Sequence, residues 1–258
     1  MKVIILMIPW YNLKNLDGET IIWRYMDIIK FLDLIQTQQL YFSNIENFND
    51  PYEGFVSIDY KEMELKNFKT VEEKNLYEAE KKEELKNYFI NCWHVNNYEN
   101  VAMWKAYTDS NNGIAIKSTI TDLVVAIGLK NYNNKEYNNN ISFGKVEYIG
   151  DLNDEEILKI KNKTIFNDKT KILLYKNISF KDENEVRLII RKKNNNNNYC
   201  KLDIDINKLI NEIYIIPTAP TYYRHIIEKL IEKYNIKNID VSTGKITDIP
   251  IIQTDIFK

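Results

Sequence analysis

The sequence contains few of the residues on which several common classes of protein depend. Its two cysteines, Cys92 and Cys200, lie far apart in a chain of 258 residues and form no C-x-x-C pair, which argues against a zinc cluster or a disulfide framework. Its 35 Lys and Arg residues nearly balance 37 Asp and Glu residues, so the strongly basic composition of a dedicated nucleic-acid coat is missing. The apolar stretch within residues 1–11 is too short for a membrane span and lacks a small-residue cleavage site. We therefore expect a cytoplasmic protein with reduced thiols.

The chain is rich enough in apolar and aromatic residues to build a core. Hydrophobic residues make up 44% of it and aromatic residues 12%, including 18 Tyr, which separates it from disordered sequences. Its length is compatible with one large domain. We predict a single domain over residues 1–258, with a Lys- and Glu-rich helical insertion at 59–88 and a C-terminal strand-helix-strand unit at 205–258.

The spacing of apolar residues predicts both strands and helices. Residues 20–26 and 40–43 have the β-branched and aromatic composition of strands, and 27–39 between them have helical spacing. Further on we expect a Lys-rich helix at about 154–176 and a hairpin in which the strand that begins at Cys200 pairs with EVRLIIRKK across an asparagine-rich turn. This mixture of hairpin-like strands and crossover helices predicts an α+β fold with a mixed, largely antiparallel sheet. The sequence has no G-x-G-x-x-G, P-loop or nucleophile-elbow motif.

The stretch YFSNIENFNDPYEG, residues 41–54, concentrates turn-forming residues behind a short apolar run. Pro51 keeps Asp50 out of the helical region, and Asn49 and Asp50 can close Asx turns on the backbone that follows. This chemistry predicts a rigid loop of the kind that frames a pocket. Asp50 and Glu53 can then face a ligand or a metal ion; alternatively, Asp50 only caps the turn and Glu53 is solvated.

Several motifs occur in the order found in one bacterial family. They are WRY at 23–25, LYFSNIENFNDPYEG, CWHVNNYENVAMWKAY followed by GIAI, FKDENEVRLI and the C-terminal IDVSTGKI. With these motifs the sequence resembles, over almost its whole length, the bacterial domain of unknown function 2971, some of whose members resemble abortive-infection and toxin-like proteins encoded beside phage-defence genes. The motif layout is similar to that of a divergent ADP-ribosyltransferase. The resemblance implies an ADP-ribosyltransferase-like fold, NAD as substrate, a macromolecular acceptor (protein or nucleic acid) and an antitoxin or defence partner.

The chemistry of NAD cleavage assigns roles to particular residues of this pattern. Breaking the nicotinamide–ribose bond passes through an oxocarbenium-like sugar, so a carboxylate must hold the ribose hydroxyl and offset positive charge. Glu183 and Glu185 in DENEVR are two apart and share one side of the chain as it enters a strand, and they resemble the Glu-x-Glu arrangement of arginine-directed transferases. By that resemblance Glu185 is the catalytic carboxylate, Glu183 assists it, and Arg24 on the first core strand grips the NAD. Alternatively, Glu183, Glu185 and Arg187 form an ordinary charged strand face.

Other residues can complete an NAD site or serve the core. Tyr41, Ser43 and Tyr107 are conceivable stacking or hydrogen-bonding partners of nicotinamide, although the helical spacing of Tyr107 equally fits core packing. His94, followed by Glu99 at the start of a helix, can be acid/base machinery, half of a metal site, or a hydrogen-bonded core histidine. The cofactor-binding residues that we predict are Arg24, Tyr41, Ser43, Asn49, Asp50, His94 and Tyr107.

Basic residues near the asparagine-rich loop can contact the phosphates of an acceptor, although at a net charge of −2 they also fit an ordinary solvated surface. The nucleic-acid or acceptor contacts that we predict are Arg187, Arg191, Lys192 and Arg224. Three classes of function stay open. We favour an NAD-dependent ADP-ribosyltransferase or NAD-cleaving toxin over a non-catalytic sensor or partner-binding module of a defence system. The third class is a metal-dependent hydrolase or nuclease that uses Asp50, Glu53, His94 and Glu99.

Overall fold

The structure, a computed structural model, describes most of the chain. The described residues are 9–48, 62, 65–108, 111–131, 140–150, 155–156, 169–193, 195, 197–239, 246–248 and 251–253. The helices are α2 (Ile28–Thr37), α4 (Val71–Leu85), α5 (Val101–Tyr107), α6 (Ile120–Asn131), α9 (Ile206–Leu209) and α10 (Thr221–Lys233), with 3-10 helices η1 (Ile45–Asn47), η2 (Lys169–Leu174) and η3 (Ile178–Glu183). The strands are β1 (Trp10–Tyr11), β2 (Ile21–Asp27), β3 (Gln39–Asn44), β4 (Tyr88–Val95), β5 (Gly113–Thr119), β6 (Ile141–Lys145), β7 (Glu147–Ile149), β8 (Tyr175–Asn177), β9 (Glu185–Arg191), β10 (Tyr199–Asp203), β11 (Glu212–Ile215), β12 (Lys237–Ile239), β13 (Ile246–Asp248) and β14 (Ile251–Gln253).

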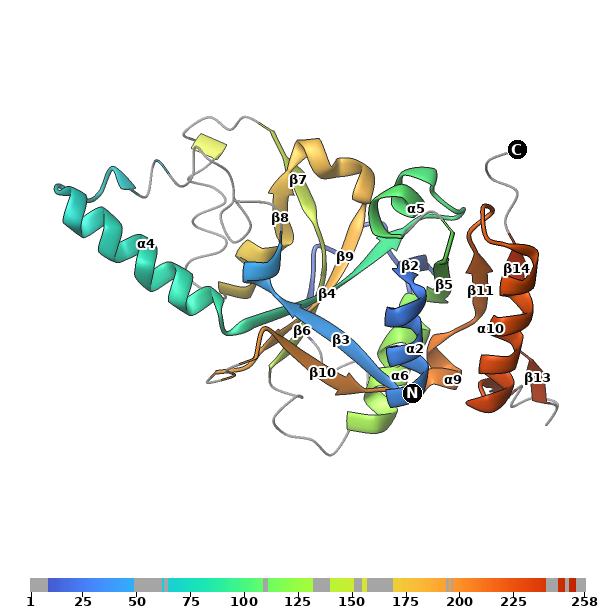
Figure 1. The fold of residues 1–258 in the computed structure, drawn as a ribbon. Coiled ribbons are helices and arrows are strands. Elements are labelled where there is room, and N and C mark those ends of the chain that lie inside the picture. Colours follow the sequence, from blue (N-terminus) through green and yellow to red (C-terminus); the bar gives the residue numbers. More distant parts are fainter. Residues whose placement is uncertain are drawn as a thin grey trace.

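Ten of the described strands form one sheet. Its order is β1-β6-β9-β4-β2-β5-β11-β14, with β3 joined to β4 and β10 joined to β3. Among the pairs that the structure describes in this sheet, β1 with β6 and β11 with β14 are parallel, and the others are antiparallel. The predicted α+β fold with a mixed, largely antiparallel sheet is confirmed. Figure 1 shows the sheet at the centre with α2 and α6 beside it.

The sheet forks beside β4. β2 pairs with the C-terminal end of β4, where Trp23 lies opposite His94, and β3 pairs with its N-terminal end. β2 continues to β5, whereas β3 continues to β10. Asn91, in the middle of β4, donates from Nδ2 to the carbonyl oxygen of Tyr41 at 2.8 Å. Two branches of the sheet therefore diverge from one edge of β4.

One face of the sheet carries the larger hydrophobic core. Phe31 and Ile35 of α2 and Leu123 and Ile127 of α6 are buried in it, because both helices place apolar residues three and four apart on one side. α2 begins where the carboxylate of Asp27 accepts the backbone N–H three residues later, as preferred at a helix N-cap. The part of this face under α2 and α6 is therefore closed by packing, and the same core extends to Trp23 of β2.

The opposite face is covered by smaller elements. Leu173 and Leu174 of η2 are buried against Tyr88 of β4 and Ile189 of β9. Gly144 of β6 permits this close approach, because a Cβ there would lie 2.5 Å from Cδ1 of Leu174. The parallel pair β7–β8 and the 3-10 helix η3 lie next to η2 along the chain. Polar side chains of β4 and β9 are thus enclosed between the sheet and these elements.

Two predictions for the second half of the chain are wrong. Residues 169–177 form η2 and strand β8 instead of the end of a helix, and most of the rest of the expected helix lies outside the described residues. β10 pairs with β3 and not with β9, because β4 and β6 already occupy both edges of β9. The strand after the asparagine-rich turn therefore joins the other branch of the fork.

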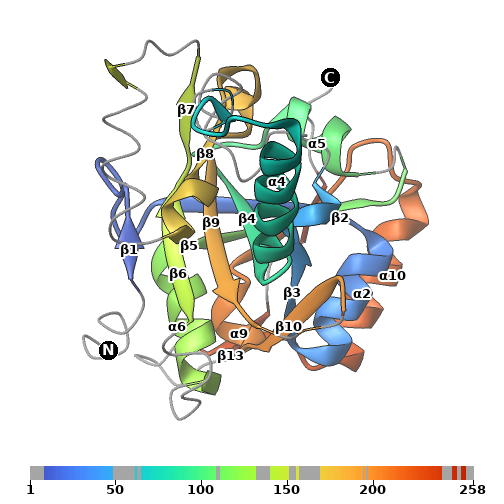
Figure 2. The same ribbon diagram turned by 90° about the vertical axis from the view of Figure 1, so that its left-hand side faces the viewer.

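Helix α4 forms without a buried face. Its N-terminus has a capping box, in which the Thr70 hydroxyl accepts from the N–H of Glu73 at 3.1 Å and the Glu73 carboxylate accepts from the N–H of Thr70 at 3.2 Å. None of its residues is buried, and Figures 1 and 2 show it standing apart from α2 and α6. Capping and charged side chains, more than packing, account for this helix.

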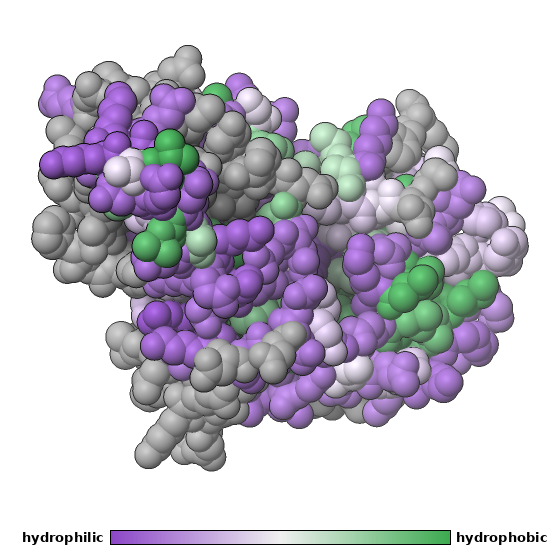
Figure 3. All heavy atoms as spheres, turned by 60° about the vertical axis from the view of Figure 1, so that its left-hand side comes forward, coloured by the Kyte–Doolittle hydropathy of each residue, from purple (hydrophilic) through white to green (hydrophobic). Residues whose placement is uncertain are grey.

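The surface is mainly hydrophilic on the face shown in Figure 3, with hydrophobic residues gathered in a few patches. Exposed large hydrophobic residues include Ile29 on α2 and Tyr222 and Ile226 on α10. Within the described part, no helix has the length and hydropathy needed to cross a bilayer.

Candidate active site

The two predicted catalytic carboxylates lie where η3 turns into β9. η3 ends at Glu183, Asn184 adopts the left-handed conformation with φ of 39°, and β9 begins at Glu185. Asparagine tolerates this conformation better than most residues, and Asn184 Nδ2 donates to the carbonyl oxygen of Val95 at 2.5 Å. Glu185 lies opposite His94 in the sheet register. The turn therefore fixes both glutamates beside the C-terminal end of β4.

The two carboxylates share one ammonium group. Lys176 of β8 donates from Nζ to Glu183 Oε2 and, at 3.4 Å, to Glu185 Oε1. Arg187 donates from Nε to Glu185 Oε2 at 2.6 Å and from Nη1 to the carbonyl oxygen of Leu173 at 2.6 Å. The side chain of Arg187 is 0% exposed, those of Glu185 and Lys176 are 5% and 6% exposed, and that of Glu183 is 18% exposed. These four charged groups, called the ion cluster below, balance one another inside the protein.

The two carboxyl groups of the ion cluster differ in pKa. Burial acts to raise the pKa of Glu185, but the positive charges of Arg187 and Lys176 outweigh it and hold this pKa at about 2. Burial, followed by the hydrogen bond and the charge of Glu185, raises the pKa of Glu183, and Lys176 opposes this rise only in part. Paired carboxyl groups with pKa values pushed apart are typical of acid/base sites. Glu183 is the member of the pair that takes up a proton first.

Two tyrosines contact these glutamates, one at a carboxylate and one at the backbone. Tyr107, at the end of α5, donates from its hydroxyl to Glu183 Oε1 at 2.9 Å, and the hydroxyl of Tyr148 in β7 accepts from the N–H of Glu185 at 2.9 Å. Burial and the neighbouring carboxylates raise the pKa of both hydroxyls, so both stay protonated. Tyr107 is 42% exposed, unlike Trp104 on the same helix, which is fully buried. The core-packing alternative therefore fits Trp104 and not Tyr107.

His94 is held as a neutral imidazole between two elements. Its Nδ1 lies 2.6 Å from the carbonyl oxygen of Glu183, and its Nε2 lies 3.3 Å from Asn100 Nδ2. The orientation of the Asn100 amide is fixed because its Oδ1 accepts from the N–H of Ala102 at 2.8 Å. A carbonyl oxygen only accepts and an amide nitrogen only donates, so the geometry assigns the proton to Nδ1. Burial lowers the pKa of His94, and both ring nitrogens are engaged in supporting the turn at Glu183.

Arg24 lies in the fork between β2 and β3. Its guanidinium carbon is 5.9 Å from the centroid of the Trp93 ring, and Nη2 donates to the carbonyl oxygen of Tyr41 at 3.4 Å. The buried Nη1 has no hydrogen-bond partner among the described residues. Burial lowers the pKa of Arg24 to about 10, against the opposite effect of the Cys92 thiol. A buried N–H group without a partner destabilises the fold unless a ligand accepts its hydrogen bond.

Arg24 and the ion cluster belong to opposite faces of the sheet. Trp23, His94 and Glu185 form one row across β2, β4 and β9, and successive residues of a strand alternate between faces. Arg24 therefore points away from that row. The fork lies beside Cys92, whose side chain is on the ion-cluster face by the same alternation and influences the guanidinium. The structure thus places Arg24 two strands away from Glu185 without direct contact.

Tyr41 and Ser43 lie on the other branch of the fork. The Tyr41 ring stacks on that of Tyr199 in β10, with centroids 5.3 Å apart and planes at 17°, and both rings are exposed. Ser43 Oγ donates to the carbonyl oxygen of Asn44 and accepts from Asn47 Nδ2, both at 3.3 Å. Neither side chain hydrogen-bonds to the ion cluster. Their part in binding a cofactor stays a prediction.

The predicted acceptor contacts are dispersed. Arg187 is fully buried in the ion cluster and is therefore no surface contact, because its strand is central in the sheet. Arg191, at the end of β9, forms an ion pair with Glu84 at 3.9 Å, and Lys192 follows it. Arg224 lies on α10, which contacts β14 at the far end of the sheet from β9. These four residues form no single basic surface.

The loop residues Asn49, Asp50, Pro51 and Glu53 lie outside the described residues. Glu99, the other predicted member of a metal site, accepts from Trp104 Nε1 at 3.1 Å. Within the described ranges, no group of three His, Cys, Asp or Glu side chains is arranged to hold a metal ion.

Lys176 and Tyr148 were not predicted from the sequence. The sequence places Lys176 at the end of the Lys-rich helix predicted at about 154–176, although it follows the apolar run ILLY at 172–175. A lysine within such a run is buried only when it is paired, and this pattern is the signal that could have identified it. Tyr148 contacts Glu185 through the backbone, and no sequence signal indicates such a contact.

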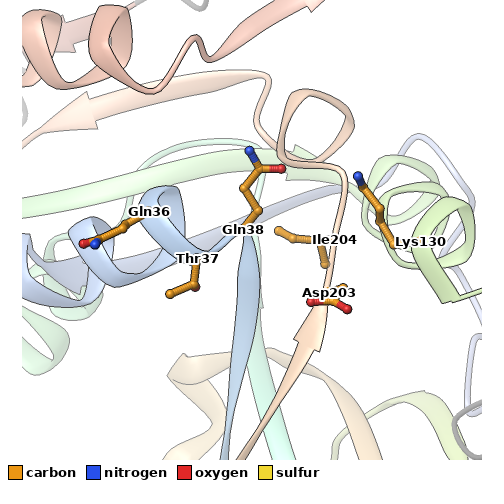
Figure 4. Close-up of a pocket in the computed structure, with 6 residues that line it drawn as sticks. All are labelled: Gln36, Thr37, Gln38, Lys130, Asp203 and Ile204. Carbon is orange, nitrogen blue, oxygen red and sulfur yellow. The ribbon is translucent and has the colours of Figure 1, made fainter.

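A separate pocket of about 380 Å³ lies at the other end of the fold. Figure 4 shows that its lining comes from the end of α2, from α6 and from the end of β10. The lining residues are Gln36, Thr37, Gln38, Lys130, Asp203 and Ile204. None of the predicted site residues is among them.

Comparisons with known proteins add to this description. The family described as "Protein of unknown function (DUF2971)" matches residues 103–188, a segment that includes Tyr107 and the whole ion cluster. A search of curated protein sequences finds no significant match.

Two solved structures of DarT from Thermus sp. 2.9 align with the chain. The structure in complex with NAD+ has a TM-score of 0.35 and 7% identity, covering 92% of this chain and 98% of that chain. The structure in complex with ADP-ribosylated ssDNA has a TM-score of 0.34 and 9% identity, covering 93% of this chain and 97% of that chain. The resemblance to the domain of unknown function 2971 is confirmed over residues 103–188, while the motifs at 23–25, 40–54 and the C-terminus lie outside this match.

Proposed function

We propose that this protein binds NAD and cleaves its nicotinamide–ribose bond, transferring ADP-ribose to a macromolecule or to water. The observation that carries this proposal is Arg24, whose buried Nη1 lacks a partner among the described residues. A guanidinium matches the geometry of phosphate oxygens, and NAD supplies a pyrophosphate. The carboxylate pair Glu183–Glu185, two strands away from Arg24 and on the other face of the sheet, supplies the negative charge that an oxocarbenium-like sugar needs. NAD would then have to pass through the fork beside Cys92, where the guanidinium of Arg24 lies.

The buried charge of Arg24 costs the fold stability, as is expected of a residue that binds a ligand. Burial lowers its pKa to about 10, which means that the charged form is less stable in the fold than in water. Residues that destabilise a fold without a structural benefit are concentrated at functional sites. A bound phosphate would reverse this effect by accepting the orphaned hydrogen bond.

The reaction balances without a further reagent. The C–N bond between ribose and nicotinamide breaks, and its electron pair leaves with neutral nicotinamide. A hydroxyl, carboxylate or ring nitrogen of the acceptor, or a water molecule, forms the new bond to the ribose carbon, and a carboxylate or the solvent takes any proton that the nucleophile releases. The protein's part is to position the sugar and to stabilise its positive charge.

The decisive experiment incubates purified protein with NAD, with and without cell lysate, and measures free nicotinamide and labelled macromolecules. We expect nicotinamide release by the wild type, and loss of NAD binding with equal or higher thermal stability in Arg24→Met. Lys229→Met is the control for loss of a surface cation, because Lys229 is exposed and paired with Glu232 at 2.8 Å on a distant helix. Absence of both nicotinamide release and NAD binding in the wild type would refute the proposal.

We further propose that the transferred group modifies a protein or nucleic acid and that the activity is toxic to a bacterial cell. Sensitivity of the labelled product to nuclease or to protease identifies the acceptor class. Expression of the wild type should arrest growth, and Arg24→Met should relieve the arrest at equal protein level. If the wild type and Arg24→Met both arrest growth, the toxicity does not depend on NAD binding and this proposal is wrong.

A further inference from the structure

We propose that Glu183, and not Glu185, is the carboxylate that contacts the substrate, and that Lys176 and the buried Glu185–Arg187 pair position it. This inference rests on the proposed NAD chemistry and states which residue contacts the ribose and which residues position it. It departs from the assignment made by resemblance, in which the second glutamate of Glu-x-Glu is catalytic. Access, occupancy and charge each distinguish the two glutamates.

Access favours Glu183. Its side chain is 18% exposed against 5% for Glu185, and it hydrogen-bonds to the buried hydroxyl of Tyr107, whose ring is partly exposed. Glu185 is the first residue of a strand with neighbours on both sides, and its carboxylate contacts the buried Lys176 and Arg187. A sugar that approaches from solvent therefore meets Tyr107 and Glu183 first.

The hydrogen-bond partners of the carboxylate oxygens and the compensation of their charge also favour Glu183. Both oxygens of Glu185 accept from cations, Oε2 from Arg187 at 2.6 Å and Oε1 from Lys176 at 3.4 Å. If Glu185 turned towards a substrate, its ion pair with the fully buried guanidinium of Arg187 would break, which is unfavourable inside a protein. Its negative charge is compensated within the ion cluster. Glu183 contacts one cation and one neutral hydroxyl and shares a hydrogen bond with Glu185, so its charge is compensated less by cations than that of Glu185.

The groups around Glu183 define its chemistry. Tyr107 faces it from α5, Lys176 from β8 and Glu185 from β9, and His94 of β4 binds its backbone carbonyl. When the nicotinamide–ribose bond breaks, the ionised Glu183 lies against the positive sugar. When the acceptor attacks, its proton passes to Glu183, whose raised pKa suits a proton acceptor. Tyr107 and Lys176 hold the carboxylate in place during both steps.

The first test compares Glu183→Gln with Glu185→Gln at a temperature where both variants are folded. Glu183→Gln should keep the wild-type melting temperature and NAD affinity while nicotinamide release falls about a hundredfold or more, as on loss of one transition-state contact. Glu185→Gln should lower the melting temperature and reduce the turnover of folded protein by a smaller factor. Glu228→Gln on α10 is the control for loss of a surface carboxylate.

The second test uses the pH dependence of turnover, which remains readable if Glu185→Gln fails to fold. A rate that requires ionised Glu183 falls on the acid side at a pH above the ordinary range of glutamate. Lys176→Met should move that limb to still higher pH, because the ammonium of Lys176 favours the ionised form. A rate that depends on Glu185 instead stays flat down to pH 4, since the pKa of Glu185 is about 2.

The outcomes are distinct from failure of the proposed function. If the wild type releases no nicotinamide, the NAD chemistry is wrong, and this assignment is wrong with it. If the wild type is active and folded Glu183→Gln keeps its turnover, or if the acid limb does not respond to Lys176→Met, only the assignment of Glu183 is overturned. A hundredfold loss in Glu183→Gln together with a shifted limb in Lys176→Met supports it.

Discussion

Replacement of Glu185 by Gln tests the energetics of the ion cluster most directly. The change keeps the shape of the side chain and removes its charge, so the fully buried Arg187 loses its ion pair with Glu185 while its contact with the Leu173 carbonyl stays. Lys176 loses one of its two carboxylate partners. The fold is therefore expected to lose two buried charge–charge contacts at once.

Two routes give the size of this effect. Removal of one partner from a buried ion pair typically lowers the free energy of unfolding by about 3–5 kcal/mol. Linkage gives a similar value, because the pKa of Glu185 falls from 4.5 to about 2 on folding, and each pKa unit corresponds to about 1.4 kcal/mol. In a chain of this length such a loss lowers the melting temperature by roughly 10 °C.

The sign of the pH dependence follows from the direction of the shift. A carboxyl group with a lowered folded-state pKa stabilises the fold above its unfolded-state pKa, and this stabilisation is lost as the pH falls from 4.5 towards 2. Glu183 acts in the opposite sense. Its raised pKa means that ionisation at neutral pH destabilises the fold, so Glu183→Gln should match or exceed the wild-type stability at pH 7.

Urea unfolding of the wild type, Glu185→Gln and Glu183→Gln at pH 7 and pH 3 measures these effects. The difference between the wild type and Glu185→Gln should shrink by about 2 kcal/mol on going to pH 3, since most of the linkage term is then lost. Equal stability of the wild type and Glu185→Gln at pH 7, or a difference that does not change with pH, would refute the account of the ion cluster.

Three further predictions concern the elements around the site. Gly144→Ala should lower the free energy of unfolding by about 1–3 kcal/mol in chemical denaturation, because the new methyl group meets the buried Leu174; unchanged stability would show that η2 can move. Thr70→Ala should destabilise α4 by about 1 kcal/mol, detected as faster amide exchange within α4 alone, since this helix has no buried residue; a global loss would contradict its independence. Asn100→Ala should destabilise the fold by about 1–2 kcal/mol and raise the pKa of His94 in an NMR titration, because Nε2 loses its donor; an unmoved pKa would refute the tautomer assignment.

Local patterning predicted the elements near the N-terminus better than the strand partners in the second half. The apolar spacing before and after α2 identified β2, α2 and β3, since each element buries one side and carries its own period. The pairing of β10 with β3 was not predictable in this way. The asparagine-rich turn places β10 next to β9 along the chain, but pairing is decided by which edges are vacant after β4 and β6 have joined β9.

The site was predictable only as a segment. The two-residue spacing of Glu183 and Glu185 indicated that they lie together, and both are in the ion cluster. Arg187 was assigned to the surface because an alternating Glu-x-Arg pattern reads the same on an exposed and on a central strand. Its burial depends on η2, whose Leu173 carbonyl accepts its hydrogen bond, and therefore on a contact between distant segments.

Buried positive charge lies both in the ion cluster and at Arg24, and the two places differ in whether the protein itself supplies the hydrogen-bond partners. Lys176 and Arg187 have carboxylate partners inside the protein, so their burial is compensated whether or not a ligand is present. Arg24 has an orphaned N–H group among the described residues and a pKa lowered by burial, so an anion bound there stabilises the fold as well as the complex. It follows from linkage that NAD should raise the melting temperature of the wild type by an amount that grows with the logarithm of the NAD concentration over Kd, and that Arg24→Met should abolish this rise while leaving the ion cluster intact.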